Sequence, residues 1–164
     1  MRYQNFDEAF NDIYPRVVRT LMVASGDKDI ATNIAQESLA YAYAHWKKCQ
    51  KQEDPIAWVR EIAIKKLKSK IYKETEINLV DEHIDMDLNT FEILEKVIRT
   101  PYAIDFVKAV GNLAFEERIV ATLTFIDDCT PHQIAKILGL AEENIRTDIY
   151  NARVSIRHSM SSAI

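Results

Sequence analysis

Apolar side chains recur at intervals of three and four residues through most of this chain, while residues that interrupt helices are scarce. The 164 residues include only 3 Gly and 4 Pro. Apolar residues with this spacing lie on one face of an α-helix, and that face can be buried against neighbouring helices. The pattern therefore predicts an all-α fold built from amphipathic helices.

Polar residues mark where the N-terminal helices are expected to begin. Asn5 can cap the first helix, which Pro15 can kink. Asp29 is the expected cap of the second helix, and Asp54 followed by Pro55 is expected to start the third. The inward-facing positions predicted for the second and third helices are Ile34, Ala35, Leu39, Ala42, Trp46, Ala57, Trp58, Ile62, Ala63 and Leu67.

The charged residues form two blocks near the middle of the chain. Segment 60–73 is rich in Lys and Arg and contains a single acid, Glu61, whereas segment 74–95 is rich in acids and contains no Lys or Arg. The helical period also weakens in the acidic segment. Because such changes mark boundaries, we expect two small helical domains, residues 1–74 and 101–164, joined by an acidic linker at 75–100.

The second domain contains the pattern of a helix-turn-helix. Thr130 and Gln133 can form a capping box at the start of one helix, and Gly139 can end it. Leu140 is expected to fill the core between the helices, and Ile145 begins a second apolar stripe. The second helix of such a unit can lie in a DNA groove. The pattern fits a surface hairpin that binds nothing equally well, so both interpretations stay open at this point.

Net charge and cysteine content limit the possible functions. A net charge of −4 and a pI near 5.6 argue against a protein that coats nucleic acid through bulk charge. Cys49 and Cys129 lack the spacing of a metal site and are expected to be reduced thiols, which favours a cytoplasmic location. No segment approaches the roughly 20 apolar residues that span a bilayer, so we expect no membrane insertion.

Motifs for catalysis, for a metal and for a cofactor are all missing from the sequence. It contains no glycine-rich phosphate loop, no His and carboxylate pair at metal-ligand spacing and no nucleophile with an evident base. We therefore expect no enzymatic activity, no bound metal and no cofactor.

Four segments, taken in order, resemble the short extracytoplasmic-function group of bacterial sigma factors, which keeps only regions 2 and 4 of the sigma-70 family. The segments are "FDEAFNDIYPRVVRTL", "NIAQESLAYAYAHW", "DPIAWVREIAIKKLKSKI" and "NLAFEERIVATL". The resemblance covers most of the chain. It implies an RNA polymerase sigma factor that binds core polymerase, recognises promoter DNA and directs transcription initiation. It also implies a possible anti-sigma partner.

The resemblance assigns candidate roles to matched positions. It places core-polymerase binding at Asn33, Ile34, Gln36 and Glu37. It places region 2 DNA binding at Tyr41, His45, Lys47, Arg60, Lys65, Lys66 and Lys68, while Trp46 and Trp58 are more simply core residues. It places region 4 DNA binding at Thr130, Gln133, Asn144, Arg146, Thr147, Asn151 and Arg153. For any of these exposed polar residues, an ordinary solvated helix face is the competing interpretation.

Several positions depart from the family pattern. Asn33 stands in place of a common Asp, Ile64 and Lys65 replace an Arg-Asn pair, and Ala114 replaces a Pro. Asp148 lies in a helix that is often basic in the family. These departures keep an alternative open, namely a diverged sigma-like DNA-binding regulator or protein-interaction module that does not program initiation.

Overall fold

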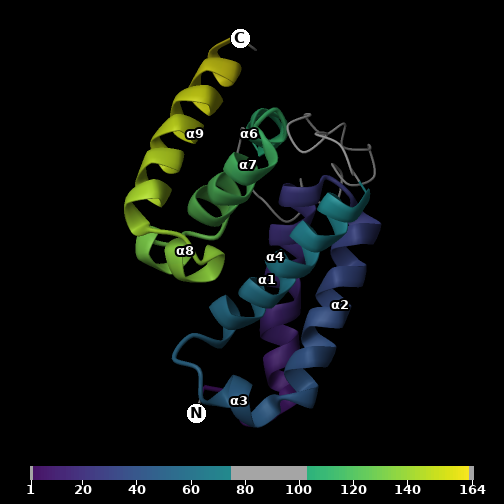
Figure 1. Cartoon of the computed structure of the whole chain (residues 1–164). Helices are drawn as coiled ribbons and strands as arrows, with labels where there is room; N and C mark the ends of the chain where they lie inside the picture. The colour runs from purple at the N-terminus through teal and green to yellow at the C-terminus, as the bar shows by residue number, and fades with distance from the viewer. Residues whose placement is uncertain (1, 75–102, 163–164) are drawn as a thin grey trace.

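The structure is a computed structural model, and it describes residues 2–74 and 103–162 of the chain. Within these ranges the secondary structure is helical, which confirms the predicted all-α class. The elements in chain order are α1 (Phe6–Ser25), α2 (Lys28–Ala44), α3 (Trp46–Gln50), α4 (Pro55–Glu74), α6 (Ala103–Gly111), α7 (Phe115–Ala121), the π-helical turn η2 (Thr122–Ile126), α8 (Pro131–Leu138) and α9 (Glu142–Ser162) (Figure 1). The acidic linker expected at 75–100 lies outside the described residues, so the two-domain division stays a prediction.

The N-terminal half, residues 2–74, is built on the long helices α1, α2 and α4, which pack against one another (Figure 1). Val17 and Leu21 of α1, Leu39 of α2 and Leu67 of α4 are completely or almost completely buried between them. The short helix α3 connects α2 to the segment before α4. Burial of this apolar face is the main stabilising contribution to the half.

The predicted helix starts are confirmed at two N-terminal positions and wrong at one. Asn5 Oδ1 accepts a hydrogen bond of 2.9 Å from the Glu8 amide, and Asp54 Oδ1 accepts one of 3.1 Å from the Ala57 amide. The cap of α2, however, is Asp27 and not Asp29, because Asp27 Oδ1 accepts hydrogen bonds from the amides of residues 29 and 30. Asp29 instead lies in the first turn, where a carboxylate interacts favourably with the helix dipole.

The C-terminal half, residues 103–162, packs α6, α7 and α8 against the long helix α9 (Figure 1). Phe115, Ile119, Ile134 and Ile145 form the centre of its core. The capping box at the start of α8 is confirmed, and Gly139 ends that helix with the left-handed φ of 67° that favours glycine. The expectation for Leu140 is wrong: its side chain is 43% exposed, since the core between the helices is filled from the helices themselves.

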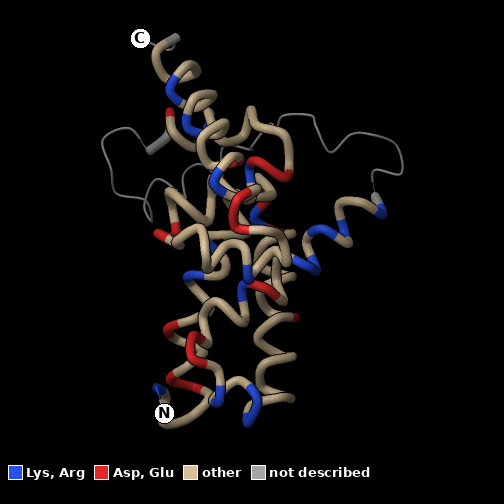
Figure 2. The backbone as a smooth tube through the Cα atoms, turned by 60° about the vertical axis from the view of Figure 1, so that its left-hand side comes forward, with Lys and Arg blue, Asp and Glu red and all other residues tan. Residues whose placement is uncertain are grey.

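The two halves pack closely against each other. Helix α4 contacts α8, and α1 contacts both η2 and α6. The buried apolar residues of both halves join in one continuous cluster. Backbone positions of Lys and Arg and of Asp and Glu both occur in the middle of the molecule, where the halves meet (Figure 2). This arrangement determines which of the candidate site residues are accessible.

Candidate functional site

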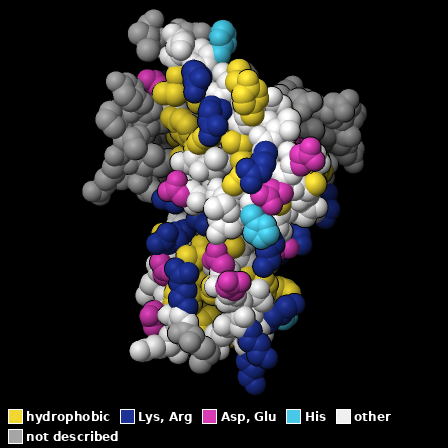
Figure 3. All heavy atoms as spheres, turned by 90° about the vertical axis from the view of Figure 1, so that its left-hand side faces the viewer, with side chains coloured by type: hydrophobic (Ala, Val, Ile, Leu, Met, Phe, Trp, Pro, Cys, Tyr) yellow, Lys and Arg dark blue, Asp and Glu magenta, His cyan; other side chains and the backbone are white. Residues whose placement is uncertain are grey.

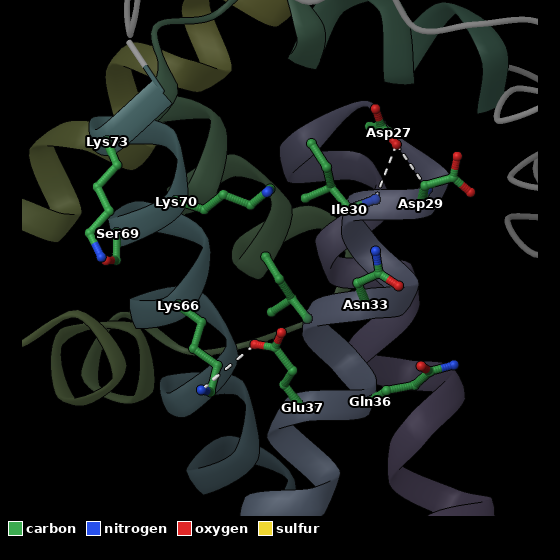
Figure 4. Close-up of a pocket in the computed structure, with 11 residues that line it drawn as sticks. Asp27, Asp29, Ile30, Asn33, Gln36, Glu37, Lys66, Ser69, Lys70 and Lys73 are labelled. Carbon is green, nitrogen blue, oxygen red and sulfur yellow. Dashed lines mark hydrogen bonds and ion pairs between the residues drawn. The ribbon is translucent and has the colours of Figure 1, made fainter. Parts of the chain in front are cut away.

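An open groove of about 640 Å³ runs between α2 and α4 and contains all four residues matched to polymerase binding (Figure 4). Asn33, Gln36 and Glu37 are exposed on α2, while Ile34 is only 4% exposed and forms part of the packed base of the groove. The difference follows from the helical period, because Ile34 belongs to the apolar stripe of α2. The groove, called the α2–α4 groove below, therefore offers three exposed polar side chains on a rigid helix.

The two walls of the α2–α4 groove carry opposite charges (Figure 4). The α2 wall contributes Asp27, Asp29 and Glu37, and the α4 wall contributes Lys66, Lys70 and Lys73. Glu37 Oε2 lies 3.8 Å from Lys66 Nζ, so one ion pair spans the groove. Both side chains are well exposed, and the pair contributes little to stability because water screens it. It can break readily when a partner enters.

The C-terminal end of α2 carries a group of aromatic side chains. Tyr41 and His45 stack with ring centroids 4.0 Å apart, and Trp58 of α4 lies 6.0 Å from Tyr41. Tyr43, on another side of the helix, packs edge-on against Phe6 at 4.9 Å. Tyr41 and His45 are exposed, as expected for contacts with unpaired bases.

Tyr43 is a candidate that the residue assignment from sequence left out. Its side chain is 65% exposed, compared with 39% for Tyr41. The two tryptophans expected in the core, Trp46 and Trp58, are half-buried at the edge of it. The signal in the sequence is Ala42, which belongs to the apolar stripe of α2, because the tyrosines on either side of it then point away from the buried face.

The basic residues predicted to bind DNA from α4 do not lie on one exposed face. Lys65 is exposed and pairs with Glu61 at 3.0 Å, and Lys68 pairs with Glu116 of α7 at 3.2 Å. Arg60 is only 7% exposed, which contradicts its expected place on an open basic surface. The reason is its spacing: Arg60 lies four residues from both Ile56 and Ile64, so it falls on the buried face of α4.

The residues matched to the DNA-reading helix lie near the start of α9. Asn144, Arg146, Thr147, Asn151 and Arg153 are all exposed. Arg146 Nη2 donates to Glu142 Oε1 at 2.7 Å, and the Arg153 guanidinium lies 5.5 Å from the Phe125 ring centroid. Both arginines are thus held in place by neighbours within the half.

Thr130 and Gln133 are engaged with the backbone of α8 and only partly available for DNA. Thr130 Oγ1 accepts from the Gln133 amide at 3.2 Å, and Gln133 Oε1 accepts from the Thr130 amide at 2.8 Å. Any phosphate contact from these residues would therefore use the remaining hydrogen-bonding capacity of side chains whose first role is capping.

Asp148 is half-buried and lies on the same side of α9 as Asn144 and Asn151, which are four and three residues away. Burial raises the pKa of its carboxyl group, and the nearby charge of Glu116 raises it further. The carboxyl group of Asp148 therefore lies beside Asn144, Thr147 and Asn151, although it is less exposed than they are. Positive and negative side chains nonetheless alternate over the visible surface of this side of the molecule, without a continuous basic patch (Figure 3).

Within the described ranges, 2–74 and 103–162, no group of His, Cys, Asp and Glu could hold a metal ion. Cys49 and Cys129 are free thiols, the first buried and the second half-buried. None of the described helices combines the length and the apolar character needed to cross a membrane.

The sequence and the fold of this chain are each similar to those of a sigma factor. No family model matches the chain. RNA polymerase sigma factor SigV of Bacillus subtilis is 24% identical over 127 residues, which cover 77% of this chain and 73% of that protein. The sigma factor RpoE of Bartonella quintana, solved in complex with the anti-sigma factor NepR, has the same fold with a TM-score of 0.74 at 18% identity, covering 97% of this chain and 98% of that one. The chain is therefore similar in sequence to one RNA polymerase sigma factor and shares its fold with a second sigma factor.

Proposed function

We propose that this protein is an RNA polymerase sigma factor that binds core polymerase through the α2–α4 groove and directs promoter recognition. The observation that carries the proposal is the set of exposed polar side chains Asn33, Gln36 and Glu37 on one wall of that groove, in a chain whose sequence is similar to that of a sigma factor. A polar contact surface suits a partner that binds and leaves in each transcription cycle, because it is stable in water when exposed. The protein would carry out no catalytic step of its own and would work in the cytoplasm.

Three surfaces of the protein would contact different parts of the promoter DNA. The exposed aromatic rings near the end of α2 can stack on unpaired bases, at about 1–3 kcal/mol per base. Lys47 and Lys65 are exposed and can hold backbone phosphates. Arg146 and Asn151 near the start of α9 have the donor and acceptor groups that read base edges in a major groove.

The negative net charge of the protein supports a role in which DNA binding depends on polymerase. A net charge of −4 gives weak non-specific attraction to DNA, because such affinity grows with the number of phosphates neutralised. A sigma factor that acts only within the polymerase complex needs little affinity of its own. The acidic composition is therefore compatible with sequence-specific contacts confined to a few side chains.

Co-elution with bacterial core RNA polymerase on gel filtration tests the polymerase-binding role. We expect the wild type to co-elute and the variant Gln36→Ala plus Glu37→Ala to co-elute less. The matched control is Asp7→Ala plus Asn11→Ala, which removes one carboxylate and one amide from exposed positions on α1. Failure of the folded wild type to co-elute would reject the proposal and favour the diverged regulator. Equal weakening by the control pair would reject the assignment of the groove.

A further inference from the structure

Asp127 lies at the end of η2 with its side chain completely buried between the two halves of the protein. The partners that its side chain has among the described residues come from the N-terminal half. The Thr20 hydroxyl donates to Oδ2 at 2.6 Å, the Arg19 guanidinium donates to Oδ1 at 3.1 Å, and Arg60 Nη2 lies 3.3 Å from the same oxygen. These four residues, called the clasp below, join the halves through one carboxylate.

The N-terminal side of the clasp has more hydrogen-bond donors than a carboxylate uses. The Nε atoms of Arg19 and Arg60 are both buried and have no hydrogen-bond partner among the described residues. The Arg60 side chain is only 8% exposed. Each guanidinium carries five donors in a planar fork suited to phosphate as well as carboxylate. Two such groups beside a hydroxyl form an anion site whose capacity exceeds what Asp127 supplies.

A second carboxylate of the C-terminal half forms an ion pair with a lysine of the N-terminal half. Glu116 of α7 lies 3.2 Å from Lys68 Nζ and accepts a hydrogen bond of 2.5 Å from the Tyr72 hydroxyl. Arg60 and Lys68 were both expected to contact DNA, and both are neutralised by carboxylates from the other half. In this closed arrangement DNA cannot reach Arg60, because the C-terminal half covers it.

We propose that Arg19, Thr20, Arg60 and Lys68 form a binding site for DNA backbone phosphates, and that Asp127 and Glu116 occupy this site in the closed protein in place of those phosphates. The inference rests on the proposed function, since it takes DNA to be the ligand of the opened site. It adds Arg19 and Thr20 to the DNA-binding residues. It also implies that DNA can bind these residues only after the two halves have separated.

The physical chemistry of buried ion pairs allows the site to exchange one anion for another. The attraction within a buried pair is largely offset by the loss of hydration, so the closed form gains little net stability from the clasp. Removal of one partner, in contrast, leaves the other charges buried without compensation. Loss of the Asp127 charge should therefore drive the halves apart and expose the arginines to solvent and to DNA.

The test compares Asp127→Asn with Asp128→Asn as a matched control. Both changes remove one negative charge at adjacent positions, but Asp128 is exposed and its φ of 53° is one that Asn tolerates. Small-angle X-ray scattering gives the radius of gyration of each protein. Fluorescence anisotropy with a fluorescein-labelled DNA duplex, over a range of salt concentrations, gives the affinity and its salt dependence.

We expect Asp127→Asn to have a larger radius of gyration than the wild type and Asp128→Asn, and to bind DNA several-fold more tightly than both. Two recovered phosphate contacts should steepen the slope of log K against log salt by about 2. Adding Arg19→Gln and Arg60→Gln should abolish the gain in DNA affinity, because the cations that bind the phosphates are then missing. A compact Asp127→Asn protein, or an expanded one that binds DNA no better than Asp128→Asn, would overturn the proposal.

A second variant covers the case in which Asp127→Asn fails to fold. Glu116 is about half-exposed, so Glu116→Gln should leave the core intact. We expect a smaller gain in DNA affinity than for Asp127→Asn, reversed by adding Lys68→Gln; the absence of any gain would count against the phosphate site. Polymerase co-elution is measured separately. A protein that gains DNA affinity but does not co-elute keeps this site and loses the sigma-factor role, whereas co-elution without the gain overturns only this inference.

Discussion

Asp127 Oδ1 lies 3.3 Å from Arg60 Nη2, so a carboxylate of the C-terminal half neutralises a cation that the family resemblance assigns to DNA. Burial raises the pKa of Asp127, while the charges of Arg60 and Arg19 and the Thr20 hydroxyl partly offset that rise. The contact connects the packing of the two halves with the availability of the DNA-binding surface. Variants of the residues between the halves therefore test two things: how the halves are held together, and whether the DNA-binding residues are accessible.

Arg118 is expected to be the most sensitive interhalf residue for stability. It is 5% exposed, Nε donates to the Ala24 carbonyl at 2.9 Å, and Nη1 donates to the Leu113 carbonyl at 3.1 Å. Burial lowers its pKa to about 10, so it stays charged at neutral pH. Arg118→Ala leaves both carbonyls without this donor and should lower the free energy of unfolding by about 2–4 kcal/mol.

Urea denaturation followed by circular dichroism measures the effect of Arg118→Ala. The control is Arg146→Ala, which removes an exposed arginine whose ion pair with Glu142 is on the helix surface. That change should cost about 0.5 kcal/mol or less. Equal effects of the two substitutions would show that the Arg118 contacts do not stabilise the protein.

Thr130→Ala should lower the free energy of unfolding by about 1 kcal/mol, because it removes the side-chain half of the capping box at α8. Thr147→Ala is the matched control, since Thr147 is exposed within α9 and its hydroxyl only donates to the Glu143 carbonyl of its own helix. We expect that control to be neutral or slightly stabilising, as alanine has the higher helix propensity. A Thr130→Ala protein as stable as the control would contradict the capping assignment.

The reactivity of Cys129 should report on the contact between the halves. Burial raises the pKa of its thiol to about 11, so the reactive thiolate is roughly one part in a thousand at pH 8. In a Cys49→Ala background, we expect the rate of reaction with a disulfide reagent to be slow at pH 8. The rate should keep rising with pH beyond 9, where an ordinary cysteine levels off.

Opening the clasp should change that behaviour. In the Asp127→Asn protein, Cys129 is expected to react faster at pH 8, with its pH profile shifted toward that of an exposed thiol, while Asp128→Asn should resemble the parent. A parent protein that already reacts as fast as a short cysteine peptide would show that Cys129 is not shielded.

Tyr43 is predicted to contact melted promoter DNA although its role was not assigned from the sequence. Tyr43→Ala should weaken binding of the polymerase complex to a forked promoter fragment by about 1–3 kcal/mol, the usual contribution of one stacked base. Tyr150→Ala is the matched control, because that tyrosine is also 65% exposed but lies on α9. Equal affinities of the two variants would remove Tyr43 from the DNA-binding set.

Features set by neighbouring residues were predictable from the sequence, and features set by the docking of the halves were not. The caps at Asn5, Asp54 and Thr130 depend on residues within one turn of helix. The error at Asp29 is also local, since two aspartates stand two residues apart and either can cap. The burial of Arg60, in contrast, depends on Asp127, which is distant in the chain, and no local pattern indicates that pairing.

The most direct test of the sigma-factor role is transcription in vitro. Core polymerase is mixed with the protein and a library of genomic fragments from the source organism, and the 5′ ends of the transcripts are sequenced. We predict start sites that require the protein, share two upstream sequence elements and become weaker with Gln36→Ala plus Glu37→Ala. Start sites identical to those of core polymerase alone would contradict the account.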